Sequence, residues 1–276
     1  MGRMTGCLLA ADVDDTLMHN GVISRRNVEA IELFLREGGL FSLATGRTVS
    51  AVAPVLRQLR RVSPSVVAGG AMIVDFENQT VLRKKTLQKQ DHALVQKALA
   101  QNLEIGVEVH SGKRVLTVSR TAESDDHQAY EDLETTVVSY EEATGLAWNK
   151  VLYFCASEQD RSRLRRVLEP EAFASDFFYT SAIIDGRQRF YLEQFPKGVS
   201  KAAALKELCA MMKIPKGKFF AIGDYDNDLE MLKAADISAA PSNACEAAKA
   251  VADFAVCSCE DGAVADFIEY LMRKEE

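Results

Sequence analysis

Two short apolar segments, each ending in a cluster of acids, constrain the fold of this chain most. Residues 7–13 and 219–222 are almost continuously apolar, and acidic residues follow directly at the end of each segment. Such runs are typical of strands that are buried on both faces of a parallel sheet. Open parallel sheets place their ligand sites at the carboxyl ends of the strands. If the two segments are neighbouring parallel strands, the two acidic clusters meet at one edge of the sheet.

The rest of the two chain ends alternates between strand and helix patterns. Ser24 can cap a helix with one apolar stripe, residues 40–44 indicate a second buried strand, and a second helix is expected from Thr48 onward. The same alternation returns between residues 200 and 272. This order predicts an α/β protein whose doubly wound parallel sheet has helices on both faces.

The middle of the chain has a different pattern. Residues 83–190 are richer in charge, and several segments there alternate polar with apolar residues, as strands with one solvated face do. We therefore expect an inserted α+β domain at 83–190 and a core formed by residues 1–82 and 191–276. A chain of 276 residues with 47% hydrophobic residues is long enough for both parts.

The bulk composition limits the classes of partner. A net charge of −7 argues against a broad electrostatic attraction to nucleic acid or anionic lipid. No segment approaches the roughly 18 uncharged apolar residues that cross a membrane. The six cysteines and four histidines are scattered, which indicates reduced structural thiols and gives little support to a zinc site or a Ser-His-Asp triad. We expect a cytosolic protein that binds a small molecule, and neither nucleic acid nor membrane.

The acidic clusters, the end of the second strand and the start of a later helix carry side chains that suit the binding of a phosphoryl group. Asp12 and Asp14 open the first cluster, and the second has the sequence Gly-Asp-Tyr-Asp-Asn-Asp. So many carboxylates in one crevice raise several pKa values or require a cation, and ligands that are all oxygen favour Mg²⁺. Thr45 and Gly46 end the second strand, and Lys201 lies in the first turn of a helix. A hydroxyl group, backbone N–H groups and an ammonium group are suitable partners for a phosphoryl group.

Four segments carry a resemblance to a known family. They are DVDDT at 12–16, ATGR at 44–47, KGVSK at 197–201 and GDYDND at 223–228. In this order they resemble the motifs of the haloacid dehalogenase (HAD) superfamily, and the insert between the second and third segments resembles the Cof-type phosphatases with an α/β cap of the C2B type. The resemblance covers the whole chain. It implies a Mg²⁺-dependent phosphatase that hydrolyses small phosphorylated metabolites, such as sugar phosphates, through an aspartyl-phosphate.

The resemblance also implies a role for each motif residue. Asp12 would attack phosphorus, and Asp14 would protonate the leaving alcohol and then activate water. The metal would be held by the Asp12 carboxylate, the Asp14 backbone carbonyl and Asp224, with Asp228 acting through water or behind the ligands. The phosphoryl oxygens would be held by the Val13 backbone N–H, Thr45, Gly46, Lys201 and Asn227.

Several assignments stay open at this point. Lys197 and Lys201 are both candidates for binding the phosphate. The position of Lys201 relative to the helix start favours Lys201. Arg47 fits a substrate or cap contact or a surface ion pair, and Asn243 fits a site contact or a helix cap. The family usually has Gly where this chain has Asp15, and a carboxylate there weakens phosphate binding unless it points away or is paired. Two alternative functions remain. One is a mutase that transfers the phosphoryl group to another hydroxyl group, and the other is a sensor that binds a phosphorylated metabolite without turnover.

Overall fold

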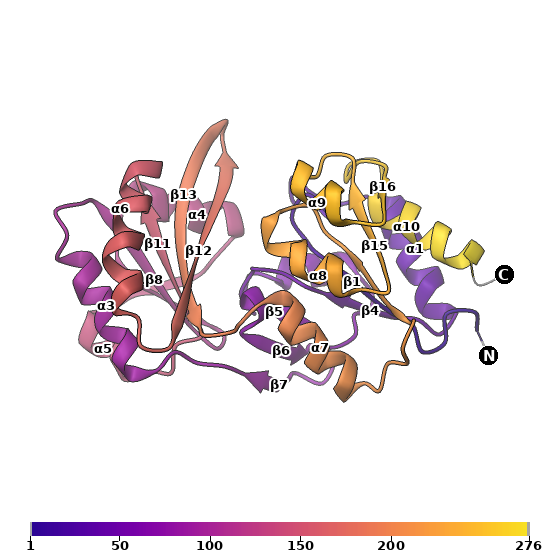
Figure 1. Ribbon diagram of the computed structural model, residues 1–276, viewed down its shortest axis with the longest axis horizontal. Coiled ribbons are helices and arrows are strands. Elements are labelled where there is room, and N and C mark those ends of the chain that lie inside the picture. Colours follow the sequence, from indigo (N-terminus) through magenta and orange to yellow (C-terminus); the bar gives the residue numbers. More distant parts are fainter. Residues whose placement is uncertain (1, 275–276) are drawn as a thin grey trace. The chain divides into compact units, whose positions relative to one another are not determined.

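The structure, a computed structural model, describes residues 2–274. It divides into two compact units, which Figure 1 shows as ribbons. The first unit comprises the chain up to Arg47, Val52–Arg83, and the chain from Ser200 onward. The second unit comprises Thr48–Ala51 and Lys84–Val199.

The first unit is built on a five-stranded parallel sheet of order β16-β15-β14-β1-β4. Its strands are β1 (Leu8–Ala11), β4 (Leu40–Leu43), β14 (Phe219–Ile222), β15 (Ile237–Pro241) and β16 (Phe254–Val256). The two apolar segments that the sequence singles out are β1 and β14, and they pair in parallel with Ala11 opposite Ile222. The condition under which the two acidic clusters meet at one edge of the sheet is therefore fulfilled.

Helices cover both faces of this sheet (Figure 1). An apolar cluster packs α7 (Lys201–Met211), α8 (Leu229–Ala234) and α9 (Glu246–Val251) on one face. On the other face, α1 (Arg25–Arg36) and α10 (Ala263–Lys274) pack against each other. Ser24 caps α1 as predicted, since its side chain accepts a hydrogen bond from the Asn27 N–H. The predicted doubly wound α/β core is confirmed.

Shorter elements extend this core. They are the hairpin of β2 (Met18–His19) and β3 (Val22–Ile23), the helix α2 (Ala53–Gln58), and a three-stranded sheet of β5 (Ser65–Val67), β6 (Met72–Asp75) and β7 (Thr80–Lys84). The turn η1 (Ala68–Gly70) joins β5 to β6. α2 begins later than predicted, with Pro54 in its first turn, where a missing N–H costs no helical hydrogen bond.

The second unit is an α+β domain around a six-stranded sheet of order β10-β9-β8-β11-β13-β12. Its strands are β8 (Ile105–Ser111), β9 (Arg114–Ser119), β10 (Thr135–Val137), β11 (Lys150–Cys155), β12 (Ser175–Ile184) and β13 (Arg187–Pro196). Its helices are α3 (Lys89–Leu99), α4 (Ala122–Glu131), α5 (Tyr140–Thr144), α6 (Glu158–Leu168) and the turn η2 (Glu169–Glu171). None of the helices between residues 2 and 274 is long and apolar enough to span a membrane.

The expectation of one solvated sheet face is wrong for the central strands of this unit. All six residues of β11 and the first six of the seven residues of β8 are buried. α3, α5 and α6 pack on one face through an apolar cluster, and α4 contacts β8 and β11 on the other. Polar side chains of these strands therefore lie inside the unit, where they contact one another instead of water.

The second unit also extends past residue 190, where the sequence suggested its end. β13 runs to Pro196 and pairs with β12 from Arg187 to the end of the strand. A cut at 190 would divide this continuous hairpin, and the unit continues to Val199.

A buried group of ionisable side chains connects α4 to β8. Glu108 Oε2 lies 3.5 Å from both His110 Nε2 and His127 Nδ1, and His127 Nε2 lies 3.5 Å from Glu131 Oε1. Burial lowers the pKa of His127, but Glu131 and Glu108 outweigh burial and raise that pKa to about 9. Burial lowers the pKa of His110, which Glu108 only partly opposes. At neutral pH His127 is therefore a cation between two carboxylates, and His110 is neutral.

The charge of His127 predicts a pH-dependent stability of the second unit. Its pKa of about 9 in the folded protein lies above the ordinary 6.5, so the stabilisation is complete below pH 6.5 and is lost as the pH rises through 9. We expect His127→Gln to lower the midpoint of thermal unfolding at pH 6 by roughly 5 °C. The difference between variant and wild type should shrink toward pH 9.5. Fluorescence of Trp148, the single tryptophan of the chain, measures this transition because Trp148 is buried in this unit.

His19→Gln is the matched control for this measurement. His19 lies in the first unit with a partly exposed side chain, so its replacement should leave the transition seen by Trp148 unchanged. A difference between His127→Gln and wild type that stays constant from pH 6 to 9.5 would contradict a charged His127.

Candidate active site

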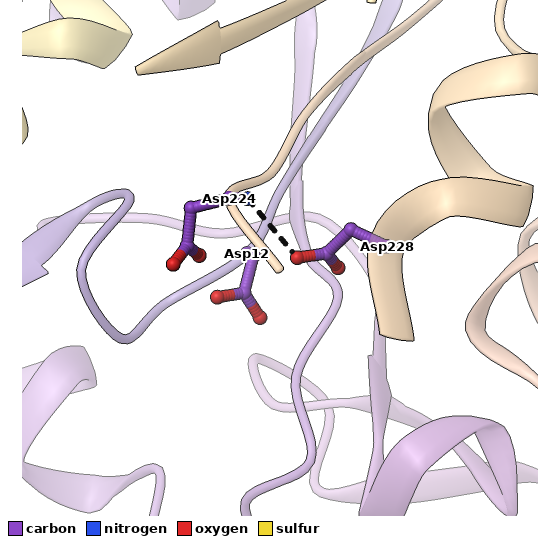
Figure 2. A group of neighbouring side chains, drawn as sticks. All are labelled: Asp12, Asp224 and Asp228. Atoms are coloured by element: carbon purple, nitrogen blue, oxygen red, sulfur yellow. Dashed lines mark hydrogen bonds between the residues drawn. The ribbon is translucent and has the colours of Figure 1, made fainter. Parts of the chain in front are cut away.

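Three carboxylates from two strand ends meet in the first unit. Asp12 follows β1 directly, and its N–H donates to the Ile222 carbonyl oxygen of β14 at 3.0 Å. Asp224 follows β14, and Asp228 ends the short turn η3 (Asp226–Asp228). Figure 2 shows the three carboxylates close together, and one oxygen of each lies within 4.8 Å of the others. The structure thus brings together acids that are more than two hundred residues apart in the sequence.

A buried ammonium group lies against this cluster. Lys201 Nζ donates to Asp12 Oδ1 at 2.6 Å and to Asp228 Oδ1 at 2.7 Å. Its side chain is only 2% exposed, and it begins α7, which Ser200 caps by accepting from the Ala203 N–H. Lys197, the alternative that the sequence left open, is exposed and lies in the second unit.

Asp228 uses its second oxygen to order the loop after β14. Its Oδ2 accepts hydrogen bonds from the N–H groups of Asp224 at 3.1 Å and Tyr225 at 3.3 Å, the first of which is drawn in Figure 2. The side chain is fully buried. A Cβ atom on Gly223 would lie 2.6 Å from the Asp228 Cγ, so only glycine fits this close approach.

Asp224 has a hydroxyl partner that sequence reasoning did not single out. The Thr16 hydroxyl donates to Asp224 Oδ1 at 2.8 Å, and Thr16 is fully buried. Thr16 ends the DVDDT segment, so its place in that motif was the available signal. This hydrogen bond ties the loop after β1 to the loop after β14.

Burial and crowding make the cluster a suitable place for a cation. Burial is the main cause that raises the pKa of Asp12 well above its usual range; Lys201 opposes it, while Asp228, Asp224 and Asp14 add to it. Burial, followed by Asp228, raises the pKa of Asp224 to about 6, against the Thr16 hydroxyl group and Lys201. The Lys201 ammonium group donates to two of these three carboxylates, and the ligand atoms that the three acids offer are all oxygen. This donor set fits a hard divalent cation such as Mg²⁺.

The Asp14 carboxylate binds Arg47. Arg47 Nε donates to Asp14 Oδ2 at 3.0 Å, and Arg47 Nη2 donates to Asp14 Oδ1 at 2.8 Å. The Arg47 side chain is 6% exposed and that of Asp14 is 41% exposed. The Arg47 side chain is too buried for the surface ion pair that the sequence left open.

The loop that carries Thr45 and Arg47 packs on η1. Thr45 is buried, and its Oγ1 accepts a hydrogen bond from the Arg47 N–H at 3.0 Å. A Cβ atom on Gly46 would meet nothing within 4 Å, so space lies beside this predicted phosphate contact. η1 in turn lies against the start of α7, where a Cβ atom on Gly70 would come within 2.2 Å of the Ser200 carbonyl oxygen. The loop and Lys201 are therefore positioned through one shared turn.

The remaining predicted residues have different surroundings. Val13 follows Asp12 and is fully buried. Asn227 is exposed on η3. Asp15 has a φ of 55°, a left-handed conformation that Gly adopts freely and Asp tolerates. The sequence suggested a local backbone group or an arginine as the partner of its carboxylate, but that carboxylate lies 3.1 Å from the side chain of His19, at Nδ1.

Asn243 connects three loops at this edge of the sheet. Its Nδ2 donates to the Asp15 carbonyl oxygen at 2.8 Å, and its Oδ1 accepts from the Cys259 N–H at 2.8 Å. Both ends of its amide group therefore bind backbone. Asn243 is therefore not the cap of the following helix, because the N-cap residue of α9 is Cys245.

The comparison with protein families decides the family. A model described as haloacid dehalogenase-like hydrolase matches residues 9–268. The chain belongs to this family. The match begins within β1 and ends within α10, so it includes the inserted unit of this HAD-family chain.

Several curated relatives of the HAD-family chain are phosphatases by name. It is 26% identical over 95% of its length to the Bacillus subtilis 5-amino-6-(5-phospho-D-ribitylamino)uracil phosphatase YitU, and the alignment covers 96% of that protein. It is 24% identical, over 95% of its length and 96% of the other, to the putative phosphatase M6_Spy0533 of Streptococcus pyogenes. It is also 26% identical over 93% of its length to the Arabidopsis thaliana chloroplastic endoribonuclease YBEY, but spans only 45% of that longer protein. The prediction of an enzyme of the phosphatase class is confirmed.

Solved structures share its fold. TM0651 from Thermotoga maritima has a TM-score of 0.82 at 21% identity, with 96% of this chain and 97% of that chain covered. The HAD subclass IIB sugar phosphatase BT4131 has a TM-score of 0.82 at 17% identity, with 96% and 98% covered. The expected fold, a HAD-like core with an inserted α+β unit, is thus confirmed.

The position of Lys201 predicts a large loss of stability when its charge is removed. Lys201→Met leaves the buried acids without their cation, a change that costs about 3–5 kcal/mol in unfolding free energy. We expect a smaller loss at pH 5 than at pH 8, because the raised pKa values of Asp12 and Asp224 let these groups become neutral. Urea unfolding followed by circular dichroism measures the difference.

Lys197→Met is the control, because it removes an exposed ammonium group from the second unit. Equal unfolding free energies for the two variants would show that Lys201 does not stabilise the carboxylate cluster.

Proposed function

We propose that the chain is a Mg²⁺-dependent phosphatase that hydrolyses small phosphorylated metabolites through an aspartyl-phosphate on Asp12. The observation that carries this proposal is the place of Asp12 between a cation and further acids. Its Oδ1 accepts from Lys201 Nζ at 2.6 Å, and Asp224 and Asp228 lie beside it. A carboxylate nucleophile next to positive charge fits phosphoryl transfer, where most of the catalysis is positioning and charge stabilisation.

The oxygen cluster would hold the metal in this proposal. Mg²⁺ would bind the carboxylates of Asp12 and Asp224 and the backbone carbonyl of Asp14, with Asp228 acting through water or behind these ligands. Bound there, it would supply positive charge for the oxygens of the transferred phosphoryl group.

In the first half-reaction Asp12 attacks the phosphorus atom. Oδ2 is the reacting oxygen, because Oδ1 accepts the Lys201 hydrogen bond. The bond from phosphorus to the leaving oxygen breaks as the Asp12–phosphorus bond forms, and Asp14 donates a proton to the leaving oxygen. The phosphoryl oxygens are bound by the Val13 N–H, Thr45, Gly46, Lys201 and Asn227.

In the second half-reaction water cleaves the aspartyl-phosphate. Asp14, now a carboxylate, takes a proton from the water as its oxygen bonds to phosphorus. The bond between phosphorus and Asp12 breaks, which releases inorganic phosphate and restores the Asp12 carboxylate. Lys201 donates to Asp12 Oδ1 and so stabilises the negative charge that returns.

Names of relatives support polyol or sugar phosphate monoesters as the substrate class. YitU and YwtE of Bacillus subtilis are both named for a substrate with a phosphorylated ribityl group. BT4131, which shares the fold, is named a sugar phosphatase. The proposed partner is therefore a small phosphorylated metabolite and neither nucleic acid nor a membrane, which the net charge of −7 supports. The free state of the cysteines supports a cytoplasmic location.

Replacement of the nucleophile gives the first test. Asp12→Asn cannot form the aspartyl-phosphate, so phosphate release from an aryl phosphate and from a panel of phosphorylated metabolites should fall to less than about one thousandth of the wild-type rate. Asp226→Asn is the matched control, because it removes an exposed carboxylate from the loop after β14 and should remain active. Full activity of Asp12→Asn would rule the mechanism out. An isomerised ester without free phosphate would instead identify a mutase.

Removal of the metal gives an independent test. Excess chelator should abolish phosphate release, and added Mg²⁺ should restore it. Mg²⁺ should also raise the midpoint of thermal unfolding of the wild type, because a ligand that binds only the folded state stabilises it. Asp224→Asn should lose this increase and Asp226→Asn should keep it. Undiminished turnover in excess chelator would contradict the metal assignment.

A further inference from the structure

The pair of Arg47 and Asp14 has the geometry of a fork. Two nitrogens of one guanidinium group donate to the two oxygens of one carboxylate, at 3.0 and 2.8 Å. Two parallel hydrogen bonds fix the plane of a carboxylate as well as its position. The Arg47 side chain is almost fully buried, whereas part of Asp14 stays accessible.

The backbone around Arg47 is fixed as firmly as its side chain. The Arg47 carbonyl oxygen accepts from the Ala68 N–H at 2.8 Å, and the Thr45 carbonyl oxygen accepts from the Gly69 N–H at 3.0 Å. The Thr45 Oγ1 accepts from the Arg47 N–H at 3.0 Å. η1 therefore sets the point from which the guanidinium group reaches Asp14.

Such a fork leaves Asp14 able to react. In its ionised form, which accepts the proton from water in the second half-reaction, the Asp14 carboxylate has about four lone-pair sites, and the two bonds from Arg47 use two of them. The others stay available, and 41% of the Asp14 side chain is exposed. A lysine in place of Arg47 would offer a point charge and would leave the carboxylate free to rotate.

We propose that Arg47 is a positioning residue for acid–base catalysis, which acts by orienting the Asp14 carboxylate and not by binding the substrate. The inference rests on the proposed function, because it assigns Asp14 the proton transfers of both half-reactions. A misoriented acid slows the chemical steps but leaves substrate binding nearly unchanged. Arg47 should therefore affect kcat and leave KM almost constant.

Steady-state kinetics of phosphate release tests this assignment. For Arg47→Ala we expect kcat to fall roughly 100-fold and KM to change by less than about threefold. Arg47→Lys should recover little of the loss, because its ammonium group cannot form the fork. Guanidinium ion at concentrations far below those that unfold proteins should raise kcat of Arg47→Ala and leave Arg47→Lys unchanged.

Arg165→Ala is the matched control. Arg165 forms the same two-bond fork with Glu169, at 3.0 and 2.8 Å, but on the second unit. Its replacement should leave kcat near the wild-type value, with no response to guanidinium ion. For Arg47→Ala, a KM increase of roughly tenfold or more at unchanged kcat would assign Arg47 to substrate binding and overturn the proposal. Unchanged kcat and KM would overturn it as well.

A crystal structure of Arg47→Ala separates this proposal from the proposed function. We expect the Asp14 side chain to leave its wild-type orientation, while Asp12 and Lys201 stay in place. An Asp14 carboxylate with the same orientation in both proteins would overturn the positioning role, whether or not the wild type hydrolyses phosphate esters. An inactive wild type with a displaced Asp14 in the variant would contradict only the proposed function.

Discussion

The contact of the Lys201 ammonium group with two carboxylates is the interaction on which the rest of this site depends. Asp12 comes from the end of β1 and Asp228 from the turn after β14, and Lys201 donates to both. Asp228 then binds two backbone N–H groups of its own loop. One buried cation thereby sets the distance between three segments that are far apart in the sequence. Without it, mutual repulsion of buried carboxylates would favour neutral acids, which bind cations poorly and are weak nucleophiles.

The close approach of these segments also depends on residues without side chains. Gly223 lets the Asp228 side chain pack against the end of β14, and Gly70 lets η1 touch the start of α7. η1 carries the hydrogen bonds that place Thr45 and Arg47. The two groups of cations and acids, one around Lys201 and one around Arg47, are thus connected through the backbone of η1. A change at η1 should therefore disturb both groups together.

Much of this arrangement could be predicted because it follows from local patterns. Buried apolar runs predicted β1 and β14 as strands of a parallel sheet, and Asp12 lies beside Asp224 if these strands are neighbours, as they are. The position relative to the helix start favoured Lys201. The partners of Arg47 and Asn243 could not be predicted, because they depend on where loops from different strands meet. The prediction for the sheet of the inserted unit was wrong for another reason. Its alternating pattern suggested water on one face, but alternation looks the same when polar side chains such as Glu108 and His127 contact each other inside the unit.

Lys201 and Arg47 differ in a way that suits the roles proposed for Asp12 and Asp14. In the proposed mechanism Asp12 needs one oxygen free for attack, and the ammonium group between Asp12 and Asp228 engages a single oxygen of each. The acid–base role proposed for Asp14 needs a fixed direction for proton transfer, and a planar guanidinium group fixes the plane of its carboxylate. Exchange of the two cations would leave the total charge the same. It would lose both geometries, because a fork on Asp12 would occupy the attacking oxygen and a point charge on Asp14 would leave its direction undefined.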